Sequence, residues 1–533
     1  MEFVAFCSMK ASNMPSERII SPNKIRAPLL ARKELSSMQN GHEANGVIPD
    51  KGTAGLTVIL GAGPAGLCSA YVLSKAGAPA LVVESAPFVG GLARTIRRDT
   101  EFGEFKFDIG GHRWFTKNEE LNNLFKEVVA DELLWVNRIS RIYSFDGKWV
   151  DYPLKMGSAL KAIGPFTAAK ALADYAKAQA EQKVRPSEIK SMKDAYILQY
   201  GETLYKLFFE AYSEKVWGMP CDDLSADWVS QRTKGMSLMT AVKDVIVPSK
   251  GTVVSLIDEF MYPRAGFGRF SERMADTIVE RGNEIRLKSP VEKIVLEGNR
   301  VKGVRVRTEN GTELIEGENF ISSIPLTVLV KITDPPAPAE VIEAADSLTF
   351  RDIITVNVMF KKPQISLDTW VYVHDRNILF GRFHEPKNWS PAMVPSDDFT
   401  SLVVEFFCTK GDHIWNMSDE QLVNQTVKHL VEDMNLVDPD EVIGGFTVRA
   451  TKAYPTYDLG YMKPLSIMKD YIQGIENLQY IGRGGSFRYN NTDHSIETGL
   501  LAAKNILGEH HNLEAVNADE EYHEMKRVSQ TVS

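Results

Sequence analysis

Apolar runs and glycine turns alternate along the chain, and the pattern is clearest between residues 56 and 84. Residues 56–60 form a short apolar run, as expected of a strand buried on both faces. Helix-compatible apolar spacing follows to about residue 75, and residues 80–83 predict a second buried strand. A strand, a helix and a strand in this order predict a nucleotide-binding α/β unit.

The turn between the first strand and the helix has the sequence G-x-G-x-x-G. Gly61 allows the tight turn, Gly63 lets the backbone approach a pyrophosphate, and Gly66 allows the helix to pack closely on the strand. The helix N-terminus offers free N–H groups to phosphates. Glu84 ends the second strand, near the usual position of the acid that accepts a hydrogen bond from a ribose hydroxyl. A turn needed only for packing would leave Glu84 unexplained, so we predict a dinucleotide site.

Two further glycine turns enlarge this site. A glycine pair at 90–91 is followed by Arg94 and returns the chain to the phosphates. A plain nicotinamide dehydrogenase does not need this turn, so we predict a larger cofactor, FAD. A second pair at 110–111 precedes His112, which could hydrogen-bond the cofactor or assist proton transfer; a purely structural histidine is the alternative.

The rest of the chain divides by its periodicity. Helical spacings at 119–130, 159–178 and 192–212 predict a helical insertion. Alternating positions between 352 and 449, interrupted by a helix at 418–435, predict an antiparallel sheet that could roof a cofactor. The predicted organisation is a disordered tail or transit peptide at 1–54, an FAD-binding domain at 55–118, 262–330 and 476–510, a helical domain at 119–261, an antiparallel-sheet substrate domain at 331–475 and a tail at 511–533.

Composition narrows the function classes. The 533 residues carry a net charge of −9, which argues against general attraction to nucleic acid. Four scattered cysteines without C-x-x-C spacing predict a reducing compartment and no metal centre. No apolar run approaches the roughly 18 residues of a membrane span. The basic, serine-containing N-terminus resembles an organelle transit peptide, so the predicted location is cytoplasmic, or a plastid or mitochondrion if that segment is a targeting signal.

Taken together, the glycine turns, Glu84 and the C-terminal Gly482-Arg483 turn with its helix resemble the two-domain FAD superfamily of amine oxidases, protoporphyrinogen oxidases and UDP-galactopyranose mutases. The resemblance covers about residues 56–508. It implies an α/β fold with a Rossmann-type, glutathione-reductase-like FAD-binding domain, a helical insertion and an antiparallel β-sheet substrate domain. Within the superfamily the chain is most similar to the UDP-galactopyranose mutases. Four stretches carry this likeness: Gly-Gly-His-Arg-Trp-Phe at 110–115, Ala-Tyr-Ser-Glu-Lys-Val-Trp-Gly-Met-Pro at 211–220, Lys-Ala-Tyr-Pro-Thr at 452–456 and Gly-Arg-Gly-Gly-Ser-Phe-Arg-Tyr-Asn-Asn-Thr-Asp-His-Ser at 482–495.

The resemblance implies roles for particular residues. In mutases, reduced FAD attacks the sugar through its N5 atom to form an adduct, a nicotinamide nucleotide, NAD(P)H, can supply the reducing electrons, and the substrate is a nucleotide diphosphate sugar. His112, Arg232 and Arg382 match residues beside the reacting atoms, and the two arginines would grip the diphosphate. The predicted cofactor-binding residues are Gly61, Gly63, Ala65, Gly66, Glu84, Ser85, Gly91, Leu92, Arg94, Gly110, Gly111, His112, Gly482, Arg483, Asp493 and Ser495. The predicted substrate-binding residues are Phe115, Tyr152, Trp217, Arg232, Trp370, Tyr372, Arg382, Tyr454, Tyr489 and Asn491.

Some features favour other interpretations. Lys155 and Trp389 stand where mutases carry a neutral amide and a phosphate-side tyrosine, so a glycosyl diphosphate is a firmer prediction than uridine or galactose. Trp217 could simply fill the helical domain, and either arginine could belong to a salt bridge. The alternative function is an FAD-dependent oxidoreductase that removes hydride from an amine, a tetrapyrrole or a polyene. The sequence leaves a homo-oligomer open.

Overall fold

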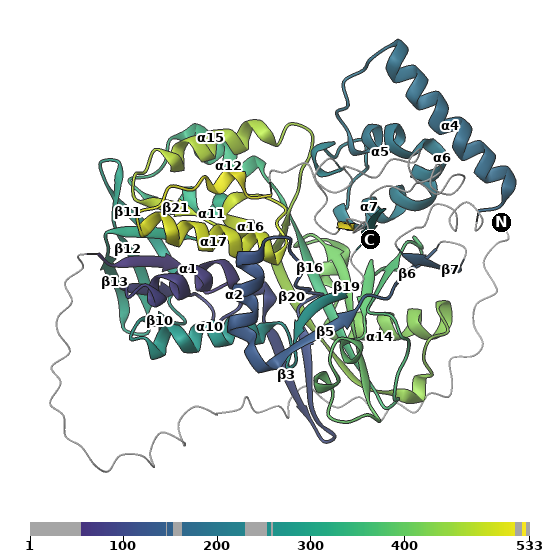
Figure 1. Ribbon diagram of the computed structural model, residues 1–533, viewed down its shortest axis with the longest axis horizontal. Helices are drawn as coiled ribbons and strands as arrows, with labels where there is room; N and C mark the ends of the chain where they lie inside the picture. The colour runs from purple at the N-terminus through teal and green to yellow at the C-terminus, as the bar shows by residue number, and fades with distance from the viewer. Residues whose placement is uncertain are drawn as a thin grey trace, which may run out of the picture. The chain divides into compact units, whose positions relative to one another are not determined.

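The computed structural model describes residues 55–144, 147–152, 163–229, 253–256, 259–517 and 525–528, of which 253–256 and 525–528 are described by backbone only. Its centre is a five-stranded parallel sheet in the order β10-β2-β1-β14-β21 (Figure 1). The strands are β1 (Thr57–Leu60), β2 (Ala80–Val83), β10 (Glu284–Arg286), β14 (Asn319–Ser322) and β21 (Leu478–Tyr480). Strands from distant parts of the chain meet in this sheet; all are short, and all but the edge strand β10 are largely buried. The predicted α/β, Rossmann-type core is confirmed.

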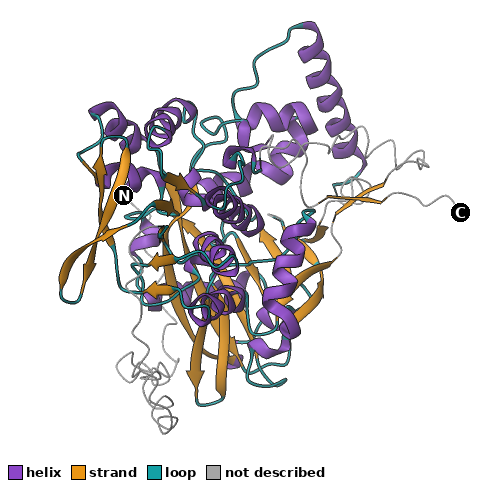
Figure 2. Cartoon of the chain, turned by 60° about the vertical axis from the view of Figure 1, so that its left-hand side comes forward, coloured by secondary structure: helices purple, strands orange, loops and turns teal. Residues whose placement is uncertain are grey.

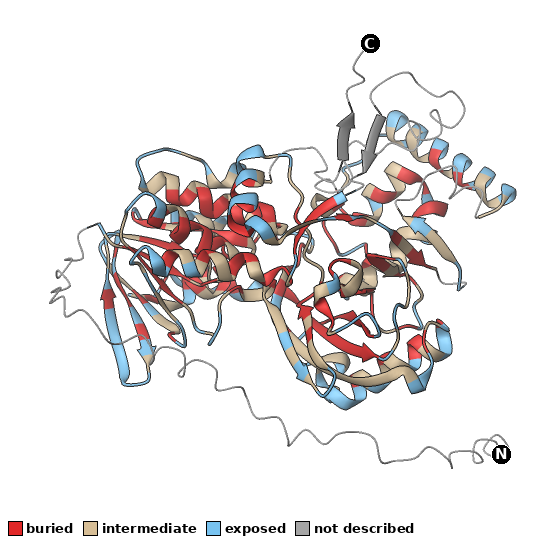
Figure 3. Cartoon of the chain, turned by 60° about the horizontal axis from the view of Figure 1, so that its bottom comes forward, coloured by how far each residue is buried: buried red, intermediate tan, exposed pale blue. Residues whose placement is uncertain are grey.

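Helices cover one face of the parallel sheet. They are α1 (Pro64–Lys75), α2 (Glu119–Val129), α10 (Gly268–Glu280), α16 (Gly482–Ser486) and α17 (Thr492–Ile506). Helices α1 and α17 cross closely because small residues meet between them: a Cβ on Gly499 would lie 2.2 Å from the Ala65 carbonyl oxygen. This crossing brings the middle of α17 against the first turn of α1. Figure 3 shows the resulting buried layer.

The other face of the parallel sheet packs against a small sheet and further helices. The small sheet contains β11 (Val291–Glu297), β12 (Arg300–Thr308), β13 (Gly311–Glu316) and β15 (Thr333–Asp334), and the helices are α11 (Leu326–Leu329), α12 (Ala339–Ser347) and α15 (Met462–Gln473). Leu60 of β1, Ala344 of α12 and Met468 of α15 share one apolar cluster. Helices α12 and α15 therefore pack with the parallel sheet, although their residues lie in the range expected for the substrate domain.

A seven-stranded sheet in the order β20-β16-β19-β18-β17-β6-β7 forms the second layer (Figure 2). Its strands are β6 (Ser140–Tyr143), β7 (Trp149–Tyr152), β16 (Phe350–Phe360), β17 (Trp370–Val373), β18 (Arg382–His384), β19 (Thr400–Cys408) and β20 (Val442–Pro455). All neighbours are antiparallel except β17 and β6, which are parallel. Two of its strands, β6 and β7, come from the range expected to be helical, which is a difference from the sequence prediction.

Both faces of the seven-stranded sheet are covered. Helix α14 (Asp419–Lys428) and the π-turn after it (His429–Asp433) pack on one face. The hairpin of β3 (Thr95–Thr100) and β4 (Gly103–Asp108) packs on the other through Phe105 and Phe107. This hairpin starts at the second glycine turn and ends at the third. The two layers therefore meet along the glycine turns.

The helical segment is more broken than its periodicity predicts. It contains α4 (Pro165–Val184), α5 (Met192–Tyr200), α6 (Glu202–Tyr205), a π-turn (Lys206–Glu210) and α7 (Ala211–Trp217). Gly201, with φ of 81°, ends α5, so the single helix expected at 192–212 is wrong. The short elements β5 (Leu133–Asn137) and β9 (Glu259–Pro263) pair with each other, as do β8 (Val253–Leu256) and β22 (Met525–Val528), and α13 (His413–Asn416) follows β19. No helix of the described residues is both long and apolar enough to cross a bilayer.

Candidate active site

The turn before α1 has the geometry of a phosphate cradle. A Cβ on Gly66 would lie 2.0 Å from the Gly61 carbonyl oxygen, so only glycine permits this turn. A Cβ on Gly63 would meet nothing of the described chain within 4 Å, and a Cβ on Gly91 would lie 3.4 Å from the Gly63 Cα atom. The two glycine turns therefore border one open space at the N-terminus of α1, where free N–H groups and the helix dipole favour a phosphate.

Glu84 and Arg94 flank this space, and their contacts with neighbouring residues hold the turns around it in place. One Glu84 carboxylate oxygen accepts from the Ala62 N–H at 2.8 Å, and the other accepts from the Ala86 N–H at 2.8 Å and the Ser85 hydroxyl at 3.0 Å. Oε2 accepts only the Ala62 bond, so it has capacity for a further donor. The Arg94 guanidinium lies over the Phe88 ring at 3.8 Å. The residues at this end thus fit a dinucleotide whose ribose hydroxyl donates to Glu84.

The third glycine turn is occupied by protein side chains. A Cβ on Gly111 would lie 1.6 Å from Cζ3 of Trp370, and a Cβ on Gly110 would lie 3.3 Å from the Glu405 carboxyl group. The Trp370 indole therefore packs directly against the backbone of this turn. Trp370 in turn stacks on His384, with 5.6 Å between ring centroids and 8° between ring planes.

Replacing Gly111 by alanine tests this contact. Because the new methyl group must displace the Trp370 indole, we expect the free energy of unfolding to fall by about 1–3 kcal/mol. Denaturant unfolding measures the loss of stability, and tryptophan fluorescence reports the displacement of the Trp370 indole. Gly484→Ala is the matched control, because its Cβ meets its first neighbour, Pro325, at an ordinary 3.4 Å. Equal stability of the two variants would contradict the proposed packing.

His112 is held as a neutral hydrogen-bond donor. Its Nε2 atom lies 3.1 Å from the carbonyl oxygens of both Leu92 and Ile109, so this nitrogen carries the proton. Burial and the nearby Arg483 guanidinium lower the pKa of His112 to about 4. The Nδ1 atom lies 3.4 Å from the Thr492 hydroxyl. At neutral pH Nδ1 therefore carries no proton and can accept a hydrogen bond, such as that from the Thr492 hydroxyl.

Two more histidines near the site are buried in neutral form, which predicts acid sensitivity. Burial and the charge of Lys215 lower the pKa of His374 to about 3, and burial and Arg382 do the same for His384. Because both values lie below the ordinary 6.5, the unfolded chain binds protons first as the pH falls. At pH 5 the earlier protonation of the unfolded chain lowers the free energy of unfolding by roughly 2 kcal/mol per histidine. Burial raises the pKa of Asp108 to about 6, so the folded chain binds this proton first and regains about 1 kcal/mol.

Thermal unfolding between pH 7.5 and 4.5 checks this prediction at constant ionic strength. We expect the melting temperature to fall as the pH drops below about 6.5. His384→Phe keeps a flat ring between its neighbours and removes one titrating group, so its profile should be less steep. A melting temperature that stays constant down to pH 5 would contradict the buried neutral histidines.

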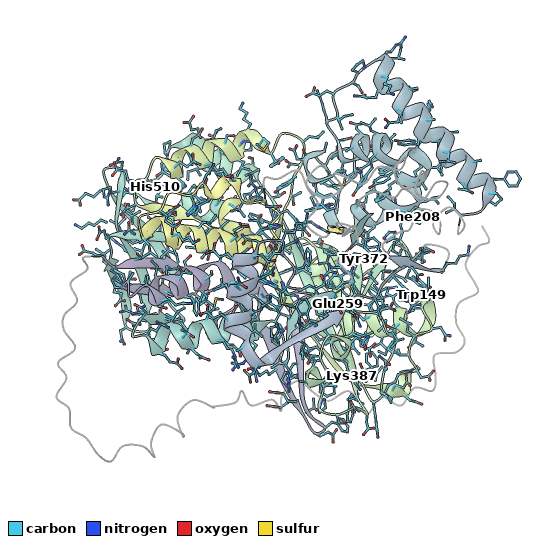
Figure 4. The ribbon with its side chains drawn as sticks, in the orientation of Figure 1. Trp149, Phe208, Glu259, Tyr372, Lys387 and His510 are labelled. Carbon is cyan, nitrogen blue, oxygen red and sulfur yellow. The ribbon has the colours of Figure 1, made fainter. Side chains whose placement is uncertain are left out.

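A cavity of about 280 Å³ opens beside the third glycine turn. Its wall combines residues of the glycine turns, the helical segment, the seven-stranded sheet and the start of α17. Figure 4 labels two of them, Phe208 from the helical segment and Tyr372 from the sheet. Predicted residues that line the cavity are Gly110, Gly111, His112, Phe115, Tyr152, Trp370, Tyr372, Arg382, Tyr454, Arg483, Tyr489, Asn491 and Asp493.

Arg382 lines this cavity, but it is not free to present its whole guanidinium group. Its Nε atom donates to Glu405 at 2.8 Å and its Nη2 atom lies 2.6 Å from the same carboxylate. Nη2 also donates to the Tyr454 hydroxyl at 2.8 Å. Although burial disfavours its charge, Glu405 holds the pKa of Arg382 above its ordinary value. Arg382 therefore forms a salt bridge with Glu405 and also lines the cavity.

The C-terminal motif supplies a second arginine. The Arg483 guanidinium lies over the rings of Tyr454 and Tyr489, at 4.9 and 5.4 Å, and the two rings are stacked. Arg483 also donates to the carbonyl oxygens of Asn490 and Ala453 at 2.7 and 3.0 Å. Asn491 is the N-cap of α17. The charge of Arg483 and the phenol groups of Tyr454 and Tyr489 therefore lie together where the two layers meet.

Some predicted site residues lie elsewhere. Arg232 and Lys155 lie outside the described residues, as does the N-terminal segment expected to be a tail or transit peptide. Trp217 is buried in the helical core behind Tyr489, with 5.9 Å between ring centroids, and does not line the cavity. The substrate contact predicted for Trp217 stays a prediction. Trp389 is also buried away from the cavity, where its indole N–H donates to the Thr369 carbonyl oxygen at 2.8 Å.

Sequence reasoning missed two buried charges. Glu405, described above, is the only charged residue of β19, and that isolation was the available signal. Lys215 belongs to the Lys-Val-Trp motif, and its ammonium group lies 2.6–3.2 Å from four carbonyl oxygens between Val373 and Phe380. These hydrogen bonds connect α7 to the loop that follows β17. Lys215 therefore supports the cavity wall that His374 lines.

The parallel sheet, its glycine cradle and the covering second sheet fit a flavoprotein. A family model described as flavin containing amine oxidoreductase matches residues 64–507. The chain belongs to the flavin containing amine oxidoreductase family, and membership implies FAD as cofactor. The predicted superfamily is confirmed.

Curated relatives are distant. A 15-cis-phytoene desaturase of Capsicum annuum is 22% identical over 410 residues, which cover 72% of this chain and 65% of the relative, just under two thirds of its length. A 15-cis-phytoene desaturase of Synechococcus elongatus is 23% identical over 70% of this chain and 78% of its own. A probable UDP-galactopyranose mutase of Klebsiella pneumoniae is 27% identical over 171 residues, or 32% of this chain and 42% of the relative.

Solved structures agree on the fold. The crystal structure of a reduced UDP-galactopyranose mutase superposes with a TM-score of 0.74 at 21% identity, covering 87% of this chain and 97% of that chain. A putative protoporphyrinogen oxidase of Exiguobacterium gives a TM-score of 0.63 at 18% identity, over 85% of this chain and 99% of its own. At these identities the likeness establishes the fold alone.

Proposed function

We propose that the protein is a flavin-dependent mutase that interconverts the pyranose and furanose forms of a nucleotide sugar such as UDP-galactose. The supporting observation is that residues from five distant segments, predicted to bind one ligand, line one cavity: Phe115, Tyr152, Tyr372, Arg382, Tyr454, Tyr489 and Asn491. The TM-score of 0.74 to a reduced UDP-galactopyranose mutase also favours this function.

FAD, bound in its reduced form, would supply the nucleophile for the anomeric carbon of the sugar. The chain's own residues bind and orient the substrate. Arg382 and the tyrosine hydroxyls supply N–H and O–H donors to a diphosphate, and these donors stabilise the charge that grows on a departing nucleotide. His112, neutral and unprotonated at Nδ1, can accept a hydrogen bond at the cavity end near the glycine turn.

An oxidoreductase is the second candidate, because phytoene desaturases match more than two thirds of this chain, whereas the curated mutase matches a third. Anaerobic mixing of the oxidised flavoprotein with single ligands separates the two. We expect UDP to perturb the visible flavin spectrum without bleaching it, and amines or polyenes to leave it unchanged. Bleaching by an amine or a polyene, with no response to UDP, would support the oxidoreductase and refute the mutase.

A further inference from the structure

A buried carboxylate lies behind the arginine of the cavity wall. Glu405 on β19 has no exposed surface, and the sheet register sets it directly opposite Arg382 on β18. Its Oε2 atom accepts from the Arg382 Nε and its Oε1 atom accepts from the Gly111 N–H at 3.3 Å. Glu405 therefore joins the seven-stranded sheet to the third glycine turn without itself lining the cavity.

This carboxylate fixes the direction in which the guanidinium group points. Nε and Nη2 of Arg382 both face Glu405, and Nη2 also donates to Tyr454. The rings of Trp370 and Phe407 lie 5.1 and 5.0 Å from the guanidinium carbon. Nη1 makes no hydrogen bond to any residue that the structure describes, and Arg382 lines the cavity. One N–H edge is thus left for a ligand.

The same arrangement orients the Tyr454 hydroxyl. A phenol carries a single O–H hydrogen, and because its oxygen accepts from Arg382, that hydrogen must point away from the guanidinium group. Within the described chain the Tyr454 hydroxyl donates to no acceptor, and Tyr454 lines the cavity. Stacking on Tyr489 and the charge of Arg483 over the ring hold the phenol in place. The O–H group is therefore available to a ligand oxygen.

We infer that Glu405 is a positioning residue for ligand binding: it holds Arg382 so that the Arg382 Nη1 and the Tyr454 hydroxyl donate together to an anionic oxygen in the cavity. The inference rests on the proposed function, in which that oxygen belongs to a nucleotide diphosphate. Glu405 does not touch the ligand. Its effect passes through Arg382 to Tyr454, so the two side chains should act on affinity as one unit.

A double-mutant cycle on the flavin-loaded protein tests this unit, with the Kd for UDP measured by titration calorimetry. Glu405→Gln and Tyr454→Phe should each weaken UDP binding about tenfold, as expected for loss of one directed hydrogen bond. The double variant should bind no more than about threefold weaker than Tyr454→Phe alone. Glu385→Gln is the matched control, because Glu385 is equally buried and hydrogen-bonded but its hydrogen bonds go to residues other than Arg382. It should change the melting temperature and leave the Kd unchanged.

The outcomes are distinct. Two results would overturn the inference and leave the proposed function standing, provided that the wild type binds UDP. One is an additive, roughly hundredfold weakening of UDP binding in the double variant. The other is a Glu405→Gln variant with an unchanged Kd for UDP. Failure of the wild type to bind UDP would overturn the proposed function, and the inference with it. If Glu405→Gln loses its flavin, Arg382→Lys takes its place in the cycle, because lysine keeps the charge beside Glu405 but lacks the second N–H edge that reaches Tyr454.

Discussion

The Gly63→Val variant is expected to fold and to be purified colourless. No described atom lies within 4 Å of a Cβ at this position, so the chain itself tolerates a side chain there. The same space is where the N-terminus of α1 would receive a pyrophosphate, and a valine would fill it. Visible absorbance of the purified protein measures the loss of flavin, and circular dichroism checks the fold.

Two further variants, Ala76→Val and Gly66→Val, serve as controls for this result. Ala76 is exposed at the opposite end of the same helix, so its variant should remain yellow. Gly66→Val should fail to fold, because its Cβ would lie 2.0 Å from the Gly61 carbonyl oxygen. A Gly63→Val protein that keeps its full flavin content would refute the assignment of the glycine turn.

The Arg382→Ala variant should lose both stability and ligand affinity. Its removal leaves Glu405 buried without a charged partner, and breaking a buried ion pair costs about 3–5 kcal/mol. Loss of a charge-assisted hydrogen bond should weaken UDP binding by a further 1.5–3 kcal/mol, roughly 10- to 150-fold. Denaturant unfolding and calorimetric titration measure the two quantities separately.

A paired substitution distinguishes the two effects. Arg382→Met combined with Glu405→Leu removes both charges and keeps similar volumes, so it should recover much of the stability. It should not recover UDP affinity, because the donors remain absent. Recovery of affinity in the paired variant would show that Arg382 supports the fold and does not bind the diphosphate.

The parts of the fold that the sequence predicted are those specified by local patterns. Residues 80–83 and 400–408 form strands as their apolar composition predicts. The Gly61 turn adopts a φ of 107°, a conformation that glycine adopts readily. These features depend on neighbouring residues in the chain, so a single sequence contains the information for them.

Other features depend on pairing between distant segments. Strands β6 and β7 are short and become strands because β17 offers an edge to β6, and β6 in turn offers one to β7. Gly201 divides a helical pattern that apolar spacing alone reads as continuous. The neighbour of Gly111 is set by packing against Trp370, more than 250 positions away, and the partner of Arg382 by the register of β18 with β19. Motifs therefore predicted which residues gather at the cavity but not which of them bond to one another.

Conversion of UDP-galactofuranose by the dithionite-reduced protein under anaerobic conditions tests the proposed activity most directly, with the products separated by anion-exchange chromatography. The proposed mutase forms UDP-galactopyranose without net consumption of reductant, and the oxidised protein forms none. Unchanged UDP-galactofuranose after incubation with fully flavin-loaded, reduced protein would contradict it.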